Sequence, residues 1–182
     1  MPEEILDGTG KGYTAQVDSQ NRVRTYSTNE TIDRHRNVEG AVFSIHFNVT
    51  PTGANDYFYY MKNTGTADLM VTDIRISSSV ATSILYEHVS GTPSYSAENA
   101  ITPTNRNLGS SGTLDATASS DVDITGLTSE GVIFFEECAN VDTRYKISTS
   151  SNIIIPQGQA MAFKRVAATG ALECVVSVYI AD

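Results

Sequence analysis

The sequence predicts an all-β fold, an antiparallel, jelly-roll-like β-sandwich with an extended N-terminal arm. At 182 residues the chain has the length of one globular domain. Val42–Thr50 alternates apolar Phe43, Ile45, Phe47 and Val49 with polar residues, which is typical of a strand with one buried face. Leu172–Ile180 repeats this pattern and places Cys174 in its apolar row. No segment shows an apolar stripe at helical spacing, so two sheets that bury their apolar faces against each other are expected.

Seven further segments are short, rich in β-branched or aromatic residues and bounded by turn residues, which favours strands. They are Tyr57–Lys62, Leu69–Ile76, Ser83–Val89, Val132–Cys138, Arg144–Ser148, Asn152–Ile155 and Ala160–Val166.

Two departures from regular alternation are expected in the body. The apolar phase slips between Val71 and Ile74, which predicts a β-bulge near Thr72 and Asp73. The stretch from Gly91 to Leu127 is rich in Ser, Thr, Asn and Gly, so we predict a long polar surface loop there.

The predicted arm covers residues 1–38, and the body covers residues 39–182. Tyr13–Asp18 and Arg22–Ser27 predict a small hairpin whose apolar area is too small to be stable by itself, so the hairpin needs another surface, such as a second chain. The arm carries five basic and six acidic residues, a net charge of −1, and leaves −8 for the body. A nearly neutral arm can approach an acidic surface that the body would avoid.

Charge and hydropathy limit the classes of partner. The formal net charge is −9, with 12 basic and 21 acidic residues, which argues against nucleic acid because phosphate contacts need clustered Lys and Arg. No apolar window is long enough to span a bilayer, so no membrane partner is expected. The acidic start Met1-Pro2-Glu3-Glu4 is unlike a secretory signal.

No catalytic set is predicted. His35 stands between two arginines, and His46 lies in the polar row of its strand, so both are interpreted as surface residues. Glu136 and Glu137 are adjacent and therefore point to opposite faces of a strand, which prevents a two-carboxylate site.

No cofactor or metal is predicted either. Asp115, Asp121 and Asp123 offer carboxylates for calcium but lack the spacing of a Ca²⁺ loop, so a solvated acidic loop is preferred. Cys138 and Cys174 have no zinc or redox spacing and are interpreted as buried thiols, able to pair only if their strands adjoin.

Consecutive aromatic residues mark one strand. Tyr57, Phe58, Tyr59 and Tyr60 present rings on both faces, of which one should belong to the core. For the other face, a subunit contact through Tyr57, Tyr59 and Tyr60 and simple burial under an overlying segment are equally supported. A platform for sugar stacking is the third alternative.

Short motifs follow one another along most of the chain. They are Asp7-Gly8-Thr9-Gly10-Lys11-Gly12-Tyr13, Ala15-Gln16-Val17-Asp18, Asn21-Arg22-Val23-Arg24, Tyr59-Tyr60-Met61-Lys62-Asn63 and Ile155-Pro156-Gln157-Gly158. In this order the chain resembles the small β-sandwich virion structural proteins of tailed bacteriophages. Members of that group act as capsid decoration (cement) proteins or as head and tail appendages.

The resemblance implies a protein of the virion, on the capsid surface, assembled in the host cytoplasm. It implies a homotrimer that binds the major capsid protein and stabilises the head, without catalysis. The arm residues expected to contact the capsid are Tyr13, Val17, Arg22, Val23, Arg24, Arg34 and Arg36. A fibre or receptor-binding module that recognises a host glycan is the alternative, and a polysaccharide hydrolase or lyase ranks last.

Overall fold

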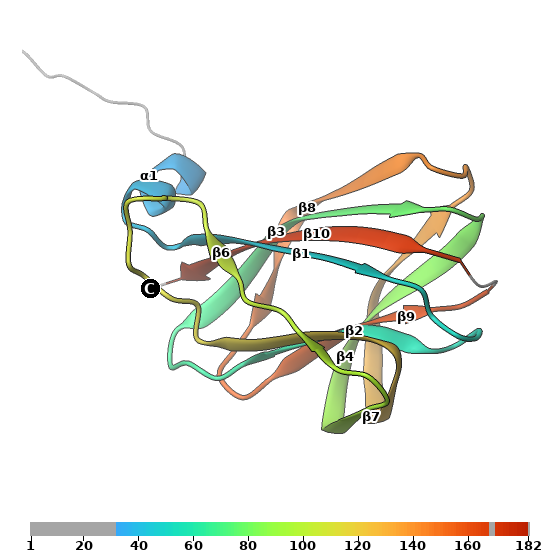
Figure 1. Cartoon of the computed structure of the whole chain (residues 1–182). Coiled ribbons are helices and arrows are strands. Elements are labelled where there is room, and N and C mark those ends of the chain that lie inside the picture. The colour runs from blue at the N-terminus through green and yellow to red at the C-terminus, as the bar shows by residue number, and fades with distance from the viewer. Residues whose placement is uncertain (1–31, 168–169, 182) are drawn as a thin grey trace, which may run out of the picture. The chain divides into compact units, whose positions relative to one another are not determined.

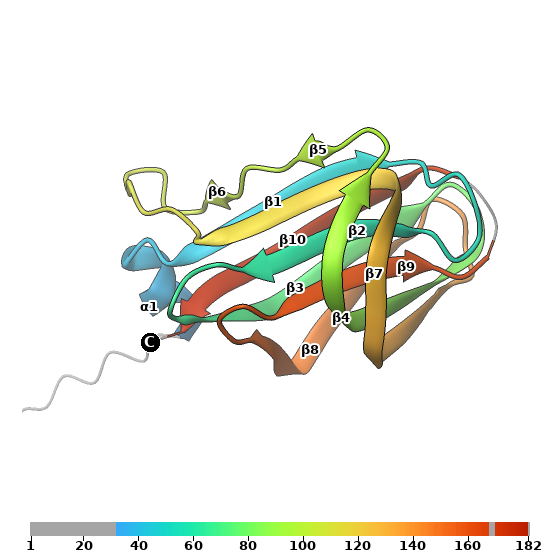
Figure 2. The same ribbon diagram turned by 90° about the horizontal axis from the view of Figure 1, so that it is seen from below.

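The computed structural model describes residues 32–167 and 170–181, and it confirms the predicted all-β sandwich. One short helix, α1 (Ile32–Val38), precedes the strands. Two antiparallel sheets pack face to face in the body (Figures 1 and 2). Residues 1–31, including the predicted hairpin, lie outside the described residues.

Among the described residues, each sheet has five strands. The first sheet has the order β6-β1-β10-β3-β8, built from Thr104–Asn105, Val42–Val49, Leu172–Ala181, Asp68–Ser78 and Arg144–Ile155. The second sheet has the order β2-β9-β4-β7-β5, built from Tyr57–Asn63, Ala160–Arg165, Thr82–Tyr95, Ala116–Cys138 and Asn99–Ala100.

The alternating segments form the centre of the first sheet, as predicted. β1 pairs with β10 along its whole length, from Val42 opposite Tyr179 to Val49 opposite Leu172. Cys174 is fully buried in the apolar row to which its spacing assigns it. The two segments predicted between residues 144 and 155 are a single strand, β8.

The predicted bulge is present in β3. The pairing of β3 with β8 shifts between Val71 and Asp73. The pairing of β3 with β10 shifts at the same place. Thr72 is therefore the extra residue, which allows Leu69, Val71, Ile74 and Ile76 all to face the core.

The prediction of a long polar loop from Gly91 to Leu127 is wrong at both ends, whereas residues 96–115 are mostly exposed and form only the two-residue strands β5 and β6. β4 continues to Tyr95, β5 and β6 follow, and β7 begins at Ala116. Ser119, Ser120 and Asp121 are buried although they are polar. Hydrogen bonds replace the water that these side chains lose, so a polar sequence can form buried strands here.

β7 is shared between two parts of the second sheet. Its first half, residues 116–124, pairs with β2, and its second half pairs with β4. The change of partner occurs beside Gly126, which has φ +76°, and opposite Gly91, which has φ +100°. A Cβ atom on Gly126 would collide with the carbonyl oxygen of Thr92, so the backbones approach too closely for any larger residue.

The bend gives the molecule two apolar clusters. The main cluster lies between the sheets and contains stacked Phe47 and Tyr59, whose ring centroids are 4.7 Å apart. The second cluster covers the outer face of the second sheet, where the β4–β7 ribbon lies over β2 and β9. Its buried members are Tyr57, Tyr60, Val89, Ile124, Ala160 and Ala162.

α1 is a local departure from the purely extended arm that the sequence predicts. Residues 32–38 are helical and belong to the compact unit that begins at Ile32. The helix ends at Val38, and Gly40 follows it with φ +75°. A side chain there would overlap Ser110, so glycine lets the 105–112 loop lie against the helix end.

Candidate functional site

The end of the body that carries α1 combines basic and exposed apolar side chains, which are the kinds that contact other proteins. Asn107 Nδ2 donates to the carbonyl oxygen of Val38 at 3.1 Å. Asn105 Nδ2 donates to the carbonyl oxygens of Gly40 at 2.7 Å and of Gly112 at 3.1 Å. The bonds to Val38 and Gly40 satisfy carbonyl groups at the end of the helix and fix the loop to it.

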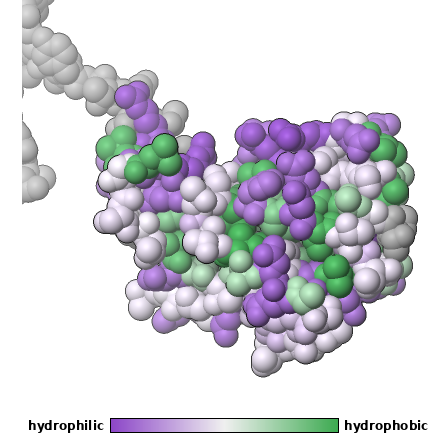
Figure 3. Space-filling model, in the orientation of Figure 1, coloured by the Kyte–Doolittle hydropathy of each residue, from purple (hydrophilic) through white to green (hydrophobic). Residues whose placement is uncertain are grey.

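Two apolar side chains are presented by this rigid junction. Val38 is 66% exposed and Leu108 is 91% exposed. The bond from Asn107, which precedes Leu108, to the backbone of Val38 links the two segments that carry them. Figure 3 shows hydrophobic residues gathered at the α1 end of the body, next to hydrophilic ones. We call Arg34, Arg36, Val38 and Leu108 the α1 surface.

The basic residues of α1 belong to the predicted contact set. Arg36 Nη1 lies 3.6 Å from Glu39 Oε2, and His35 Nε2 lies 3.3 Å from Glu39 Oε1. Glu39 therefore draws both side chains toward the C-terminal end of the helix, where positive charge is favoured. Of the predicted arm contacts, Tyr13, Val17, Arg22, Val23 and Arg24 lie outside the described residues.

The tyrosines of β2 are buried within their own chain. Tyr59 lies in the main core, and Tyr57 and Tyr60 lie in the second cluster. The Tyr57 hydroxyl donates to Glu87 Oε2 at 2.5 Å. Burial under the β4–β7 ribbon, one of the two interpretations from sequence, accounts for these rings, and they leave almost no surface for a subunit or a sugar.

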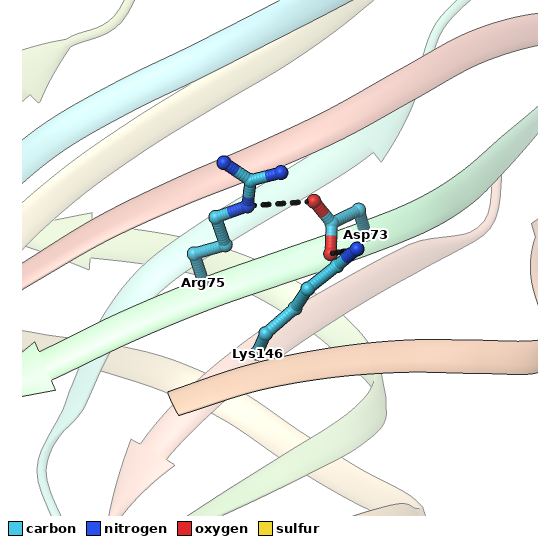
Figure 4. Close-up of polar contacts among 3 residues, drawn as sticks. All are labelled: Asp73, Arg75 and Lys146. Atoms are coloured by element: carbon cyan, nitrogen blue, oxygen red, sulfur yellow. Dashed lines mark hydrogen bonds and ion pairs between the residues drawn. The ribbon is translucent and has the colours of Figure 1, made fainter. Parts of the chain in front are cut away.

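A basic row crosses the outer face of the first sheet, and periodicity along the chain does not reveal it. Arg75 on β3 is opposite Lys146 on β8, and Arg144 follows on β8 opposite Ser77. Asp73 lies between the two facing cations, 2.9 Å from Arg75 Nε and 3.9 Å from Lys146 Nζ (Figure 4). One carboxylate reduces the repulsion of two cations, so the row keeps a net positive charge.

An open depression of about 360 Å³ lies where the predicted acidic loop was expected. Asn48, Asn99, Ser120 and Asp121 contribute its polar lining. Asp121 accepts hydrogen bonds from the backbone nitrogens of Ser96 at 2.5 Å, Ala97 at 3.1 Å and Val122 at 2.6 Å.

These bonds favour the ionised form of Asp121. Burial raises the pKa of this carboxyl group, but the three backbone N–H groups and the Ser96 hydroxyl outweigh burial and lower it. Within residues 32–167 and 170–181, no cluster of His, Cys, Asp and Glu has the arrangement of a metal site.

The fold places the other residues considered for chemistry in different surroundings. His46 is exposed and faces Glu173 at 3.3 Å. Cys138 and Cys174 are both free thiols in the main core, and burial raises the pKa of Cys138 to about 11. Glu137 is exposed at the edge of the second sheet, whereas Glu136 is partly buried on the opposite face of the same strand.

Comparison of the chain with protein-family models, curated proteins and solved structures finds no match. In the part of the chain that the structure describes, α1 is a helix of seven residues, and no helix has the length and apolar character needed to cross a membrane.

Proposed function

We propose that the protein is a capsid decoration (cement) protein of a tailed bacteriophage, which binds the major capsid protein and stabilises the head. The observation that carries the proposal is the α1 surface, where exposed Val38 and Leu108 adjoin basic residues at the point of attachment of the N-terminal segment. Exposed apolar side chains beside charged ones are typical of protein interfaces.

The division of charge supports a docking direction. The body beyond the predicted arm carries a net charge of −8, whereas α1 has basic residues at positions 34 and 36. An approach through the α1 surface brings these cations toward a partner and keeps most acidic groups away from it. The N-terminal segment then extends the contact across the shell.

The proposed mechanism is mechanical and needs no reaction. A protein that bridges neighbouring capsid subunits binds the closed shell more tightly than the separated subunits, so its binding free energy opposes separation. In a homo-oligomer on the capsid surface, the arms of the copies act together because the first contact raises the effective concentration of the next.

Truncation tests the contribution of the N-terminal segment. The full chain and a chain starting at Ile32 are each mixed with capsids assembled from the major capsid protein, and binding is measured by cosedimentation. We expect the truncated chain to keep its circular dichroism spectrum and to lose capsid binding. Equal capsid binding by the full and the truncated chain would contradict a role of the N-terminal segment in binding the capsid.

Substitution tests the α1 surface in the full chain. Val38→Asp together with Leu108→Asp should weaken capsid binding about tenfold or more, because charged groups would replace apolar contacts at the interface. Ile154→Asp is the matched control, since Ile154 is 53% exposed on β8 in the first sheet. If Ile154→Asp and the double variant weaken capsid binding equally, the α1 surface is not the contact with the capsid.

The second candidate is a fibre or receptor-binding module that recognises a host glycan. The depression containing Asn48, Asn99 and Asp121 favours it, because amide and carboxylate oxygens bind sugar hydroxyl groups. Binding on a glycan array that Asn99→Ala abolishes would favour this candidate. The number of copies per virion separates the two, since a cement protein matches the number of capsid subunits and a fibre does not.

A further inference from the structure

Two strand edges lie next to each other on one side of the body. Residues 132–138 of β7 pair with β4, and β8 pairs with β3. Among the described residues, neither segment has a partner strand on its other side. Residues 139–143 connect β7 directly to β8, so the two edges belong to opposite sheets on the same flank of the sandwich.

The β7 edge is apolar and acidic on its outer face. Phe135 is 53% exposed and Ile133 is 40% exposed, and Glu137 follows in the same row. Phe134 and Cys138 point the other way, into the main core. Edge strands with exposed apolar side chains associate readily with other strands, because their backbone N–H and C=O groups are available.

The β8 edge is basic on its outer face. Arg144 and Lys146 are exposed there, and Asp73 is shared between Lys146 and Arg75. Within residues 32–167 and 170–181, neither Arg144 nor Glu137 forms an ion pair. Glu137 and Arg144 therefore carry opposite charges that no ion pair neutralises within the described part of one copy.

We propose that two copies of this chain associate about a two-fold axis parallel to the strands, with β7 of each copy adding to β8 of the other. Such a rotation exchanges the positions of the two sheets, so the second sheet of one copy continues into the first sheet of its partner. Strand directions are unchanged by this rotation. β7 and β8 run in opposite directions, so the new pairing is antiparallel.

The same rotation sets which residues meet. Positions along the axis are preserved, and Cys138 and Arg144 lie at the same end of the sandwich. Glu137 therefore faces the partner's Arg144, and Phe135 lies against the alkyl chain of the partner's Lys146. Each contact occurs twice, as in any isologous interface. An acidic edge beside a basic edge is complementary to the same pair of edges turned by 180°. The occupant is therefore a second copy of this chain.

Charge exchange tests the contact in solution with the full chain. Glu137→Arg places a guanidinium against the partner's Arg144, and Arg144→Glu places a carboxylate against the partner's Glu137. Each single variant should weaken self-association by about tenfold or more, because two like-charged contacts replace two attractive ones. Mass is measured by sedimentation velocity over a range of concentrations, and circular dichroism checks folding.

Mixing the two variants gives the decisive result. In a mixed pair, the side chain of Glu137→Arg faces that of Arg144→Glu, and the unchanged Glu137 of one copy faces the unchanged Arg144 of the other, so both contacts are attractive. The substituted arginine of one copy then faces the substituted glutamate of the other, so equal amounts of the two weakly associating variants should form a heterodimer. Asp68→Arg and Arg106→Glu are matched controls on exposed residues at the opposite end of the first sheet from Arg144, and they should associate like the unchanged chain. The pairing needs no capsid, so its failure leaves the proposed function standing.

Three results would overturn the proposal. They are a full chain that stays monomeric, a dimer that both single variants retain, and two variants that remain monomeric when mixed. A trimer, as the phage resemblance implies, would also overturn it, because a two-fold contact of this kind closes at two copies.

Discussion

Asp121 shows how a single residue converts a polar sequence into ordered structure. Its carboxylate accepts three backbone hydrogen bonds from Ser96, Ala97 and Val122 and links the end of β4 to β7. The residue is buried, so these bonds replace its hydration. The acidic side chain that suggested a solvated loop therefore holds the end of β4 against β7.

Asp121→Asn should destabilise the body by about 1–3 kcal/mol at neutral pH, because an amide NH₂ would face N–H donors. The lowered pKa of Asp121 means that its contribution is present above the unfolded pKa of about 3.9 and is lost as the pH falls below that value. The difference between the two proteins should therefore shrink toward acid pH.

Urea unfolding from neutral pH to pH 3 measures this difference. Asp115→Asn is the control, because Asp115 is exposed nearby on the approach to β7. A loss of stability that does not change with pH would contradict the role assigned to the Asp121 carboxylate.

Alternation predicts the burial of individual residues well, and it fails where burial depends on distant partners. Cys174 is buried as its row requires. Arg165 is also fully buried, and its guanidinium donates to Thr82 Oγ1 at 3.2 Å and to the carbonyl oxygen of Gly170 at 2.7 Å. Nothing in the local sequence distinguishes Arg165 from a surface arginine, because its acceptors come from other segments.

At the scale of elements, β7 organises the second sheet. It pairs with β2, β4 and β5, and its bend allows the β4–β7 ribbon to cover the outer face. The aromatic strand β2 is buried on both faces as a result. Sequence periodicity alone identifies only the last part of β7, since its first half contains few apolar residues.

Gly126→Ala should destabilise the protein by about 1–3 kcal/mol, because a side chain is strained at positive φ and would collide with Thr92. Gly131→Ala is the matched control on the same strand, since a Cβ atom there has no neighbour within 4 Å. Chemical denaturation measures both. Equal stabilities of the two variants would show that the bend does not need glycine.

Hydrophobic periodicity in the sequence does not predict the helix α1. The helix has only seven residues, and the Asn105 and Asn107 side chains bind the backbone at its C-terminal end. Short helices depend on such tertiary contacts, which a local pattern cannot reveal.

For the whole molecule, buried tyrosines make alkaline pH the condition that should unfold it. Desolvation raises the pKa of five tyrosines in the described body, namely Tyr57, Tyr59, Tyr60, Tyr86 and Tyr95. A raised pKa stabilises the fold below the unfolded value of about 10, and this contribution is lost as the pH rises further.

Ultraviolet absorbance of phenolate measures this effect. We expect the four buried tyrosines, Tyr57, Tyr59, Tyr60 and Tyr86, to ionise only together with loss of the circular dichroism spectrum, and all nine tyrosines of the chain to titrate near pH 10 in denaturant. Ionisation of all nine near pH 10 in a protein that stays folded would contradict their burial.

The candidate surfaces were predictable only in part. The basic residues of α1 stand out in the sequence, and Arg34 and Arg36 belong to the predicted contact set. Leu108 stands in a polar stretch of the sequence, where nothing marks it as a contact residue. Its segment is linked to Val38 by the bond from Asn107. The basic row needs the register of β3 and β8, which places Arg75 opposite Lys146.

The sequence by itself determined the class of the fold, the positions of most strands, the bulge at Thr72 and the burial of the alternating rows. These features follow from local periodicity, because side chains on a strand alternate between faces. The tertiary structure decided which strands are neighbours, how β7 bends over β2, and which charges share a face. Those properties depend on pairing between distant segments, and hydrogen-bonded pairing carries no local signature in the chain.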